Sequence, residues 1–262
     1  MSTLGRPIGA GEECEVFEGE PGRVLRVARR QGVGEGFDAE RVAMQAARDA
    51  GFPVPRVYDL LEVDGRAAMV LERVDGGDAF SRFAARPWEL PRLAKMTGAL
   101  QADLHRVRAP DGVPRPVEVA PGLLTDPAIP EALQERAAAR LVHLVEGDRL
   151  LHGDFHPGNV LLGPDGPVLI DWPNAVAGPP AADLAMTTII LSVASPGEVS
   201  VVERTLVALA RRLYTRLHLK SALAKEPSTT PADVAAWVPV MAALRLRDGI
   251  GVERDALLRL AA

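Results

Sequence analysis

The stretch LLHGDFHPGNVLL at residues 150–162, followed by IDW at residues 170–172, is the most informative part of this sequence. It contains the pattern H-x-D-x-x-x-x-N, in which Asp154 and Asn159 carry oxygen atoms that can accept a proton or bind a cation. Asp171 follows a short apolar run, and the Pro-Asp-Gly turn before that run predicts two short strands. One loop and one hairpin are therefore expected to gather two carboxylates and an amide.

This set of side chains suits the transfer of a phosphoryl group. The reaction needs a carboxylate that orients the attacking hydroxyl and accepts its proton, and oxygen ligands that hold Mg²⁺ on the phosphates. Carboxylate and amide oxygens are the ligands that magnesium prefers. The alternative interpretation is a proline-interrupted polar loop with incidental acidic residues, but it requires several polar positions and a strand–turn–strand to coincide.

Upstream of this stretch, short apolar runs bounded by turn residues predict strands. These runs are residues 16–17, 24–28, 57–63 and 67–71. Asp64-Gly65 between the last two runs is a strong two-residue hairpin signal. Residues 37–50 instead have apolar side chains at helical spacing, and Gly51 follows as a stop signal.

After the Asp-Gly-Gly sequence at residues 75–77, most of the chain has the apolar spacing of helices. We expect helices at residues 90–107, 131–145, 181–193, 199–217 and 231–247, and strands at residues 160–162 and 168–170. The proline-rich residues 109–130 are interpreted as an ordered coil connector. The outline is an α+β protein with an antiparallel-sheet lobe containing one helix in residues 1–74 and a larger, mostly helical lobe in residues 75–262.

HGDFHPGNVLL followed by IDW resembles the catalytic loop and the metal-binding segment of the aminoglycoside phosphotransferase and choline kinase-like family. The resemblance implies a two-lobed, protein-kinase-like fold and transfer of the γ-phosphate of a magnesium-bound nucleotide, ATP or GTP, to a hydroxyl of a small molecule. It implies that Asp154 is the catalytic base and that Asn159 and Asp171 ligate magnesium. Recognisable elements extend from about residue 9 to residue 185.

Several neighbouring polar residues are expected to support this loop. By the resemblance, Asp183 braces the loop from the next helix, and His105 is a buried histidine with satisfied hydrogen bonds. His152 is expected to shape the loop by packing and hydrogen bonding. His156 has no assigned chemistry, and we expect it to have a structural role.

Residues 9–16 fit a degenerate glycine-rich loop, G-x-G-x-x-C-x-V, with cysteine at the position of a third glycine. In this interpretation the backbone N–H groups of the loop, which begins at Gly9 and Gly11, cover the phosphates of a nucleotide, and Val16 caps the adenine. The glutamates of this loop are unfavourable beside a triphosphate, and we expect them to point outward.

The third strand departs from the family pattern, because it lacks the lysine that contacts the α- and β-phosphates. The first lysine in the chain is Lys95. Arg26 stands at the matching position, two residues after Val24, which would roof the adenine. The guanidinium is always charged and suits phosphate bidentately, and Glu40 is its expected partner. The alternative for Arg26 is a solvated strand arginine, since other arginines flank it.

The purine edge is expected to be held by backbone groups just after the strand at residues 67–71. By the resemblance, the Glu72 carbonyl and the Val74 amide face the purine edge, and Leu161 and Ile170 lie beneath the ring. Each apolar residue around the base could equally be plain core. Together they form the apolar sandwich that a planar base requires.

Composition limits the partners. The 262 residues carry a formal net charge of −5, which argues against nucleic acid and is compatible with a cationic small substrate. One cysteine permits no intrachain disulfide, no secretory signal is visible, and no apolar run approaches the roughly 20 residues that span a bilayer. We expect a cytoplasmic monomer or weak dimer without a membrane or nucleic-acid partner.

The sequence leaves the acceptor open. Acidic residues after residue 181 are interleaved with arginines, and Asp248 is the first choice for an acceptor carboxylate. The main hypothesis is a kinase of antibiotic-like, aminoglycoside-type molecules or of metabolites. A nucleotide-binding scaffold without turnover is the alternative that the missing lysine and the acidic loop suggest. A protein kinase ranks last, because residues 172–180 leave no room for a long activation segment.

Overall fold

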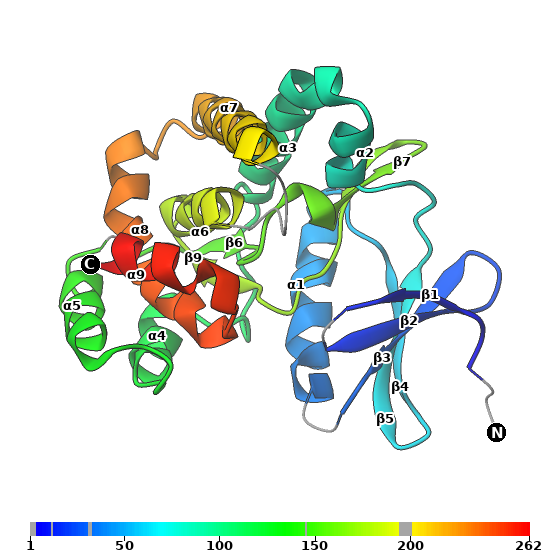
Figure 1. Ribbon diagram of the computed structural model, residues 1–262. Coiled ribbons are helices and arrows are strands. Elements are labelled where there is room, and N and C mark those ends of the chain that lie inside the picture. Colours follow the sequence, from blue (N-terminus) through cyan, green and yellow to red (C-terminus); the bar gives the residue numbers. More distant parts are fainter. Residues whose placement is uncertain (1–3, 12, 31–32, 145, 194–200) are drawn as a thin grey trace.

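A five-stranded antiparallel sheet forms the N-terminal part of the computed structural model, which describes residues 4–11, 13–30, 33–144, 146–193 and 201–262. The strand order is β1-β2-β3-β5-β4 (Figure 1). The strands are β1 (Pro7–Ala10), β2 (Cys14–Glu18), β3 (Arg23–Ala28), β4 (Val57–Val63) and β5 (Arg66–Glu72). All four predicted strands upstream of the helical region are thus confirmed.

Local sequence explains the turn and the helix of this part. Asp64 and Gly65 join β4 to β5 with φ angles of 52° and 74°, the positive values that a two-residue hairpin turn requires. Helix α1 (Phe37–Asp49) buries an apolar stripe that includes Ala43 and Met44, as the helical spacing predicts. Glu40 on the same helix is the exception, because it is a buried charged residue.

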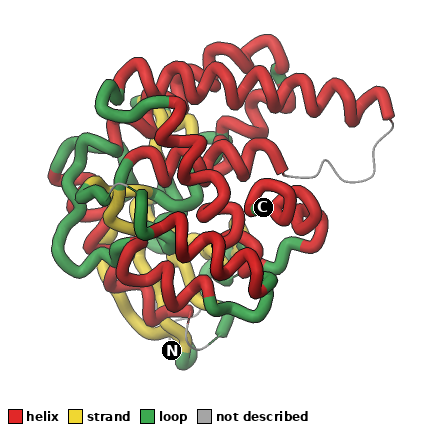
Figure 2. The backbone as a smooth tube through the Cα atoms, turned by 90° about the vertical axis from the view of Figure 1, so that its left-hand side faces the viewer, coloured by secondary structure: helices red, strands yellow, loops and turns green. Residues whose placement is uncertain are grey.

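Helices make up most of the remaining chain, as predicted (Figure 1). They are α2 (Ala79–Ala85), α3 (Leu90–Leu104), α4 (Pro116–Leu124), α5 (Glu131–Leu141), α6 (Pro180–Val193), α7 (Val201–Lys225), α8 (Pro231–Arg245) and α9 (Arg254–Ala261). Helix α3 packs along α7, and α6 packs against α8. Figure 2 shows the first part of α7 extending beyond the neighbouring helices.

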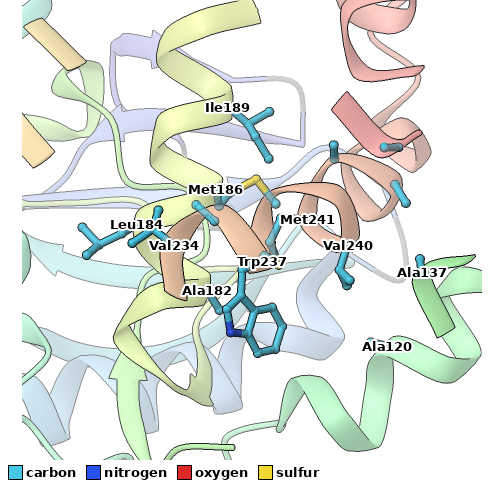
Figure 3. Packing of buried hydrophobic residues seen from close by; sticks show 14 of the residues in the cluster. Ala120, Ala137, Ala182, Leu184, Met186, Ile189, Val234, Trp237, Val240 and Met241 are labelled. Carbon is cyan, nitrogen blue, oxygen red and sulfur yellow. The ribbon is translucent and has the colours of Figure 1, made fainter. Parts of the chain in front are cut away.

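The core of the helical part lies where α6 and α8 meet (Figure 3). Trp237 and Met241 from α8 pack there near Met186 and Ile189 from α6. Trp172 is likewise fully buried. Within the described ranges, no helix is long and apolar enough to cross a membrane.

Several predicted boundaries were wrong. The expected coil at residues 109–130 contains α4, which begins at a proline; the missing N–H is harmless there, because first-turn amides have no partner within the helix. Helix α7 continues to Lys225, eight residues past its predicted end at 217, and residues 199–200 lie outside the described residues. The predicted helices at 90–107 and 131–145 end at Leu104 and Leu141, and residue 145 is likewise outside the described part.

Candidate active site

The loop at residues 152–159 lies between two small strand pairs. Strand β6 (Arg149–Leu151), which pairs with β9 (Val176–Gly178), leads into it, and the short 3-10 helix η3 (Pro157–Asn159) ends it. The hairpin of β7 (Val160–Gly163) and β8 (Gly166–Leu169) then returns the chain, and the Ile170 N–H donates to the Asn159 carbonyl at 2.9 Å. The predicted hairpin therefore brings residue 171 back to the loop.

Two backbone positions in this region have unusual conformations. Gly153 has φ 78°, and a Cβ at this position would lie 2.3 Å from the Asn174 carbonyl oxygen, so only glycine fits without movement. Asp171 has φ 66°, which is uncommon for a residue other than glycine. Residues held in sparsely populated conformations cluster at functional sites.

Asp154 is held by its own loop. The Asn159 side-chain amide donates to the Asp154 backbone carbonyl at 3.0 Å and to its carboxylate at 3.3 Å. The imidazole of His156 lies 3.6 Å from the same carboxylate. Burial opposes ionisation, but His156, His152 and Arg245 outweigh it, so the pKa of Asp154 lies below its ordinary value. The group is therefore a carboxylate that can accept a hydrogen bond from a hydroxyl.

Asp183 fixes the loop from helix α6. One of its oxygens accepts from the Gly153 N–H at 2.8 Å, and the other accepts from Gln101 and from His105 Nε2, both at 2.9 Å. The residue is fully buried, and these hydrogen bonds outweigh burial and lower the pKa of Asp183 to about 2. The expected bracing contact is present, whereas His105 is only half satisfied, because its Nδ1 has no partner among the described residues.

The two loop histidines differ. His152 is buried, donates from Nε2 to the Ile170 carbonyl at 3.0 Å and meets Trp172 edge-on, and burial lowers its pKa. These contacts agree with the structural role expected of His152. His156 accepts the Gly158 N–H through Nδ1 and also faces Asp154, so it contacts the carboxylate as well as shaping the turn.

On the opposite side, Arg26 forms a buried ion pair with Glu40. Arg26 Nη1 donates to a Glu40 oxygen that also accepts the Trp172 N–H at 3.2 Å. Arg26 Nη2 lies 3.6 Å from Asp171. The Arg26 side chain is only 11% exposed, so it is not a solvated strand arginine. Burial alone would lower the pKa of Arg26, but Glu40, Cys14 and Asp171 together outweigh burial and raise it, so the guanidinium stays charged.

One cleft joins these groups. The cleft is lined by every residue that the sequence predicted as a nucleotide ligand, a metal ligand or the catalytic base, except Asn159. Asn159 is buried behind Asp154. The lining residues among those predicted are Gly9, Gly11, Val16, Val24, Arg26, Glu40, Glu72, Val74, Asp154, Leu161, Ile170 and Asp171. The carboxylate of Glu72 accepts from the Arg56 N–H at 2.9 Å and from Arg48 at 3.4 Å, and the Glu72 N–H donates to the Arg56 carbonyl at 2.8 Å.

The glycine-rich loop differs from the expectation at Gly11. The Gly11 N–H donates to the Cys14 carbonyl at 2.9 Å, so this amide is engaged within the turn and not free for a phosphate. Glu13 lines the cleft, whereas Glu15 turns to Arg66 at 3.0 Å. Glu15 thus faces away from the cleft as predicted, Glu13 is an exposed residue of the cleft lining, and residue 12 lies outside the described residues.

The structure adds a residue that sequence reasoning missed. Arg245, at the end of α8, places Nη1 3.9 Å from the Asp154 carboxylate and 3.5 Å from that of Asp248. Its other nitrogens bond to Glu253 at 2.8 and 3.4 Å. No local signal could have found this contact, because Arg245 and Asp154 are distant in sequence. Asp248, the predicted acceptor carboxylate, lines the cleft, and burial raises its pKa.

Asn159 and Asp171 each carry a side-chain oxygen that could bind a cation. Asn159 uses its side-chain N–H₂ as donor, so its oxygen remains free, and Asp171 offers a half-exposed carboxylate. No group of three or more histidine, cysteine, aspartate or glutamate side chains suited to a metal occurs within the described ranges. The donor set fits Mg²⁺, which is usually bound through one or two carboxylates together with waters and substrate phosphates.

Sequence comparison relates the chain to phosphotransferases. The model described as the phosphotransferase enzyme family matches residues 5–219. A hydroxyurea phosphotransferase from Kitasatospora aureofaciens is 34% identical over 217 residues, 67% of this chain and 63% of that protein. A streptomycin 6-kinase from Streptomyces glaucescens is 35% identical over 140 residues, 49% of this chain and 44% of that protein. The chain spans less than two thirds of the length of these relatives.

Structural comparison concerns the fold. The aminoglycoside-3'-phosphotransferase of type VIII superposes with a TM-score of 0.66 at 20% identity, covering 94% of this chain and 92% of that one. Other solved aminoglycoside phosphotransferases of similar fold are complexes with GDP or with ADP and streptomycin. The predicted α+β, protein-kinase-like fold is thereby confirmed.

Proposed function

Because the chain belongs to the phosphotransferase enzyme family, we propose that it moves the γ-phosphate of a magnesium-bound nucleoside triphosphate, ATP in the first place, to a hydroxyl of a small molecule. One observation carries the proposal. Asp154 and Asp171 line the same cleft as the buried Arg26–Glu40 pair, so a base, a metal ligand and a phosphate-binding cation face one space. We propose that residues 1–74 and 75–262 are the two lobes that this cleft separates.

The nucleotide is proposed to lie between the sheet and the β7–β8 hairpin. Val16 and Val24 would cover one face of the base, and Leu161 and Ile170 the other. Backbone groups at residues 72–74 would hold its edge. Arg26, fixed in direction by Glu40, would contact the phosphates in place of the usual lysine, since a guanidinium binds phosphate oxygens bidentately.

Asn159 and Asp171 are proposed to hold Mg²⁺ through their side-chain oxygens. The ion supplies positive charge to the phosphate oxygens on which negative charge accumulates during transfer. Asp171 lies 3.6 Å from Arg26 Nη2, so a cation and the guanidinium would share this carboxylate. Asn159 would fix Asp154 at the same time, since its N–H₂ group bonds to that residue.

Asp154 is proposed to orient the acceptor hydroxyl and receive its proton. As the acceptor oxygen bonds to the γ-phosphorus, the bond from that phosphorus to the bridging oxygen breaks, and the nucleoside diphosphate leaves with the electron pair. The lowered pKa of Asp154 keeps the carboxylate ionised before the reaction. Asp183, which accepts a hydrogen bond from the Gly153 N–H, would hold the loop in position relative to the phosphates.

The acceptor is proposed to be a small hydroxyl compound, antibiotic-like or metabolic, because the names of the curated relatives specify hydroxyurea and streptomycin. One observation favours a second candidate, a nucleotide-binding scaffold without turnover. The Gly11 amide is engaged by Cys14, and Glu13 lines the cleft, so the loop offers less to a triphosphate than an ordinary glycine-rich loop.

Mass spectrometry separates these candidates. The protein is incubated with Mg·ATP or Mg·GTP and a panel of aminoglycosides, hydroxyurea and amino alcohols, with Asp154→Asn as the control. The kinase proposal expects a phosphate adduct that requires Mg²⁺ and Asp154. Nucleotide binding without Asp154-dependent adduct or hydrolysis would favour the scaffold, and the absence of magnesium-dependent nucleotide binding would contradict both.

A further inference from the structure

Beyond Asp154 the cleft continues between α6, α7 and α8, where its lining is mostly apolar. Met186, Ile190, Val207, Met241, Leu244 and Ile250 contribute to this wall. The charged lining residues of this part are three arginines and two acids, namely Arg211, Arg245, Arg247, Asp248 and Glu253. A pocket that binds a polycation needs carboxylates without partners. Whether Asp248 and Glu253 already have partners therefore decides which kind of ligand this part of the cleft can bind.

Both acids are already engaged by Arg245. Glu253 is bound through two contacts of 2.8 and 3.4 Å, and the side chains of this pair are 6% and 10% exposed. The remaining nitrogen of Arg245 lies 3.5 Å from Asp248 and 3.9 Å from Asp154. An ammonium beside the reacting hydroxyl would therefore meet a guanidinium next to the base, and like charges at such distances repel.

Arg211 differs from the other two arginines of this wall. It lies on α7 and is half-buried, and its guanidinium has no hydrogen-bond or ion-pair partner within the part of the chain that the structure describes, whereas its backbone carbonyl accepts from the Thr215 hydroxyl at 2.9 Å. The charge of Glu253 acts on Arg211, but the Glu253 carboxylate is bound by Arg245. Arg247 in contrast lies 3.5 Å from Asp126. A partly desolvated guanidinium without a partner is suited to bind a planar or tetrahedral oxyanion.

We propose that the acceptor is an alcohol with a largely apolar body and one anionic group, a carboxylate or a phosphate, which Arg211 binds. Arg245 disfavours acceptors with an ammonium group beside the reacting hydroxyl. The inference rests on the proposed phosphotransfer and names its acceptor class. It replaces the sequence-based expectation of a cationic acceptor.

Size-matched aromatic alcohols test the proposal. The probes are 4-(hydroxymethyl)benzoate, the neutral 4-(hydroxymethyl)benzamide, the cationic 4-(aminomethyl)benzyl alcohol and 4-(hydroxymethyl)phenylphosphonate. Their affinities are measured by ligand-observed NMR with a non-hydrolysable Mg·ATP analogue bound, and phosphate adducts are followed separately with Mg·ATP. The benzoate or the phosphonate should bind roughly tenfold or more tightly than the amide, as for a hydrogen bond to a charged group, and the ammonium probe should bind most weakly. The stronger of the two anions identifies the group.

Variants assign the effect to one side chain. Arg211→Gln should remove the anion preference, and Arg211→Lys should retain part of it. Arg212→Gln is the matched control, because Arg212 is an exposed neighbour on the same helix that does not line the cleft. The inference is overturned if neither anionic probe binds more tightly than the amide, if Arg211→Gln leaves the preference unchanged, or if the ammonium probe binds most tightly.

Nucleotide turnover in the same samples separates this inference from the proposed function. If Asp154-dependent release of phosphate from Mg·ATP occurs while the anion preference is missing, only the acceptor class is wrong. If Asp154-dependent turnover is missing for every probe and for water, the proposed function fails and the acceptor inference fails with it.

Discussion

Replacing Glu40 with alanine would leave the Arg26 guanidinium buried without its main counter-ion. The Glu40 side chain is 2% exposed and that of Arg26 is 11% exposed, so little water can replace the lost carboxylate. The Trp172 N–H would lose its acceptor as well. Asp171 remains 3.6 Å away, but its side chain is 49% exposed and compensates only in part. Breaking a buried ion pair costs about 3–5 kcal/mol, and we expect the lower value, about 3 kcal/mol.

Two comparisons isolate the cause. Asp38 lies on the same helix and pairs with Arg41 at 3.0 Å, but its side chain is 79% exposed. Asp38→Ala should therefore change the free energy of unfolding by less than about 0.5 kcal/mol. The double variant Arg26→Met/Glu40→Leu removes both charges and should recover much of the lost stability, since apolar residues often replace a buried pair without cost.

Urea unfolding followed by tryptophan fluorescence and circular dichroism measures these differences. In thermal unfolding, Glu40→Ala should lower the midpoint by roughly 6–12 °C. The double variant should regain stability but not nucleotide binding, because the pair is expected to act on the phosphates. Equal losses in Glu40→Ala and Asp38→Ala, or a double variant no more stable than Glu40→Ala, would refute the reasoning.

Two further predictions concern pH and the loop. Burial lowers the pKa of His218 to about 3, so below pH 6.5 the unfolded chain binds a proton that the folded protein does not. The free energy of unfolding should therefore fall by about 1.4 kcal/mol per pH unit as the pH is lowered from 6.5 toward 3, and His218→Gln should flatten this slope in urea titrations. Gly153→Ala should slow phosphate transfer by roughly 100-fold, measured by initial rates, because the new Cβ would lie 2.3 Å from the Asn174 carbonyl. Gly22→Ala is its control, since Gly22 has a similar φ of 77° and nothing within 4 Å, and it should leave the rate unchanged.

The parts of the site that the sequence predicted are those specified locally. Asp154, Asn159 and Asp171 lie on one loop and the hairpin that follows it, so turn chemistry alone brings them together. The pairing of Arg26 with Glu40 could also be predicted, because the family pattern pairs a cation on the third strand with a helix glutamate, and Arg26 stands where that pattern has lysine.

The parts that could not be predicted depend on contacts between distant segments. Arg245 reaches Asp154 because α8 packs against α6 and ends beside the loop, and its own neighbourhood in the sequence resembles a solvated, charge-mixed helix. Helix α4 was missed because prolines both begin helices and end them, and spacing alone does not distinguish the two. The hydrogen bond of the Gly11 N–H depends on the conformation of its turn, which the residue types alone do not determine.

The most direct test of the central claim does not require the acceptor. Release of inorganic phosphate from Mg·ATP is measured for the protein and for Asp154→Asn, together with the affinity of each for the nucleotide. The account predicts slow hydrolysis by the protein, a rate lower by roughly 100-fold or more in Asp154→Asn, and nucleotide affinities that agree within a few-fold. Equal hydrolysis by both proteins, or no magnesium-dependent binding of ATP or GTP by either, would contradict the account.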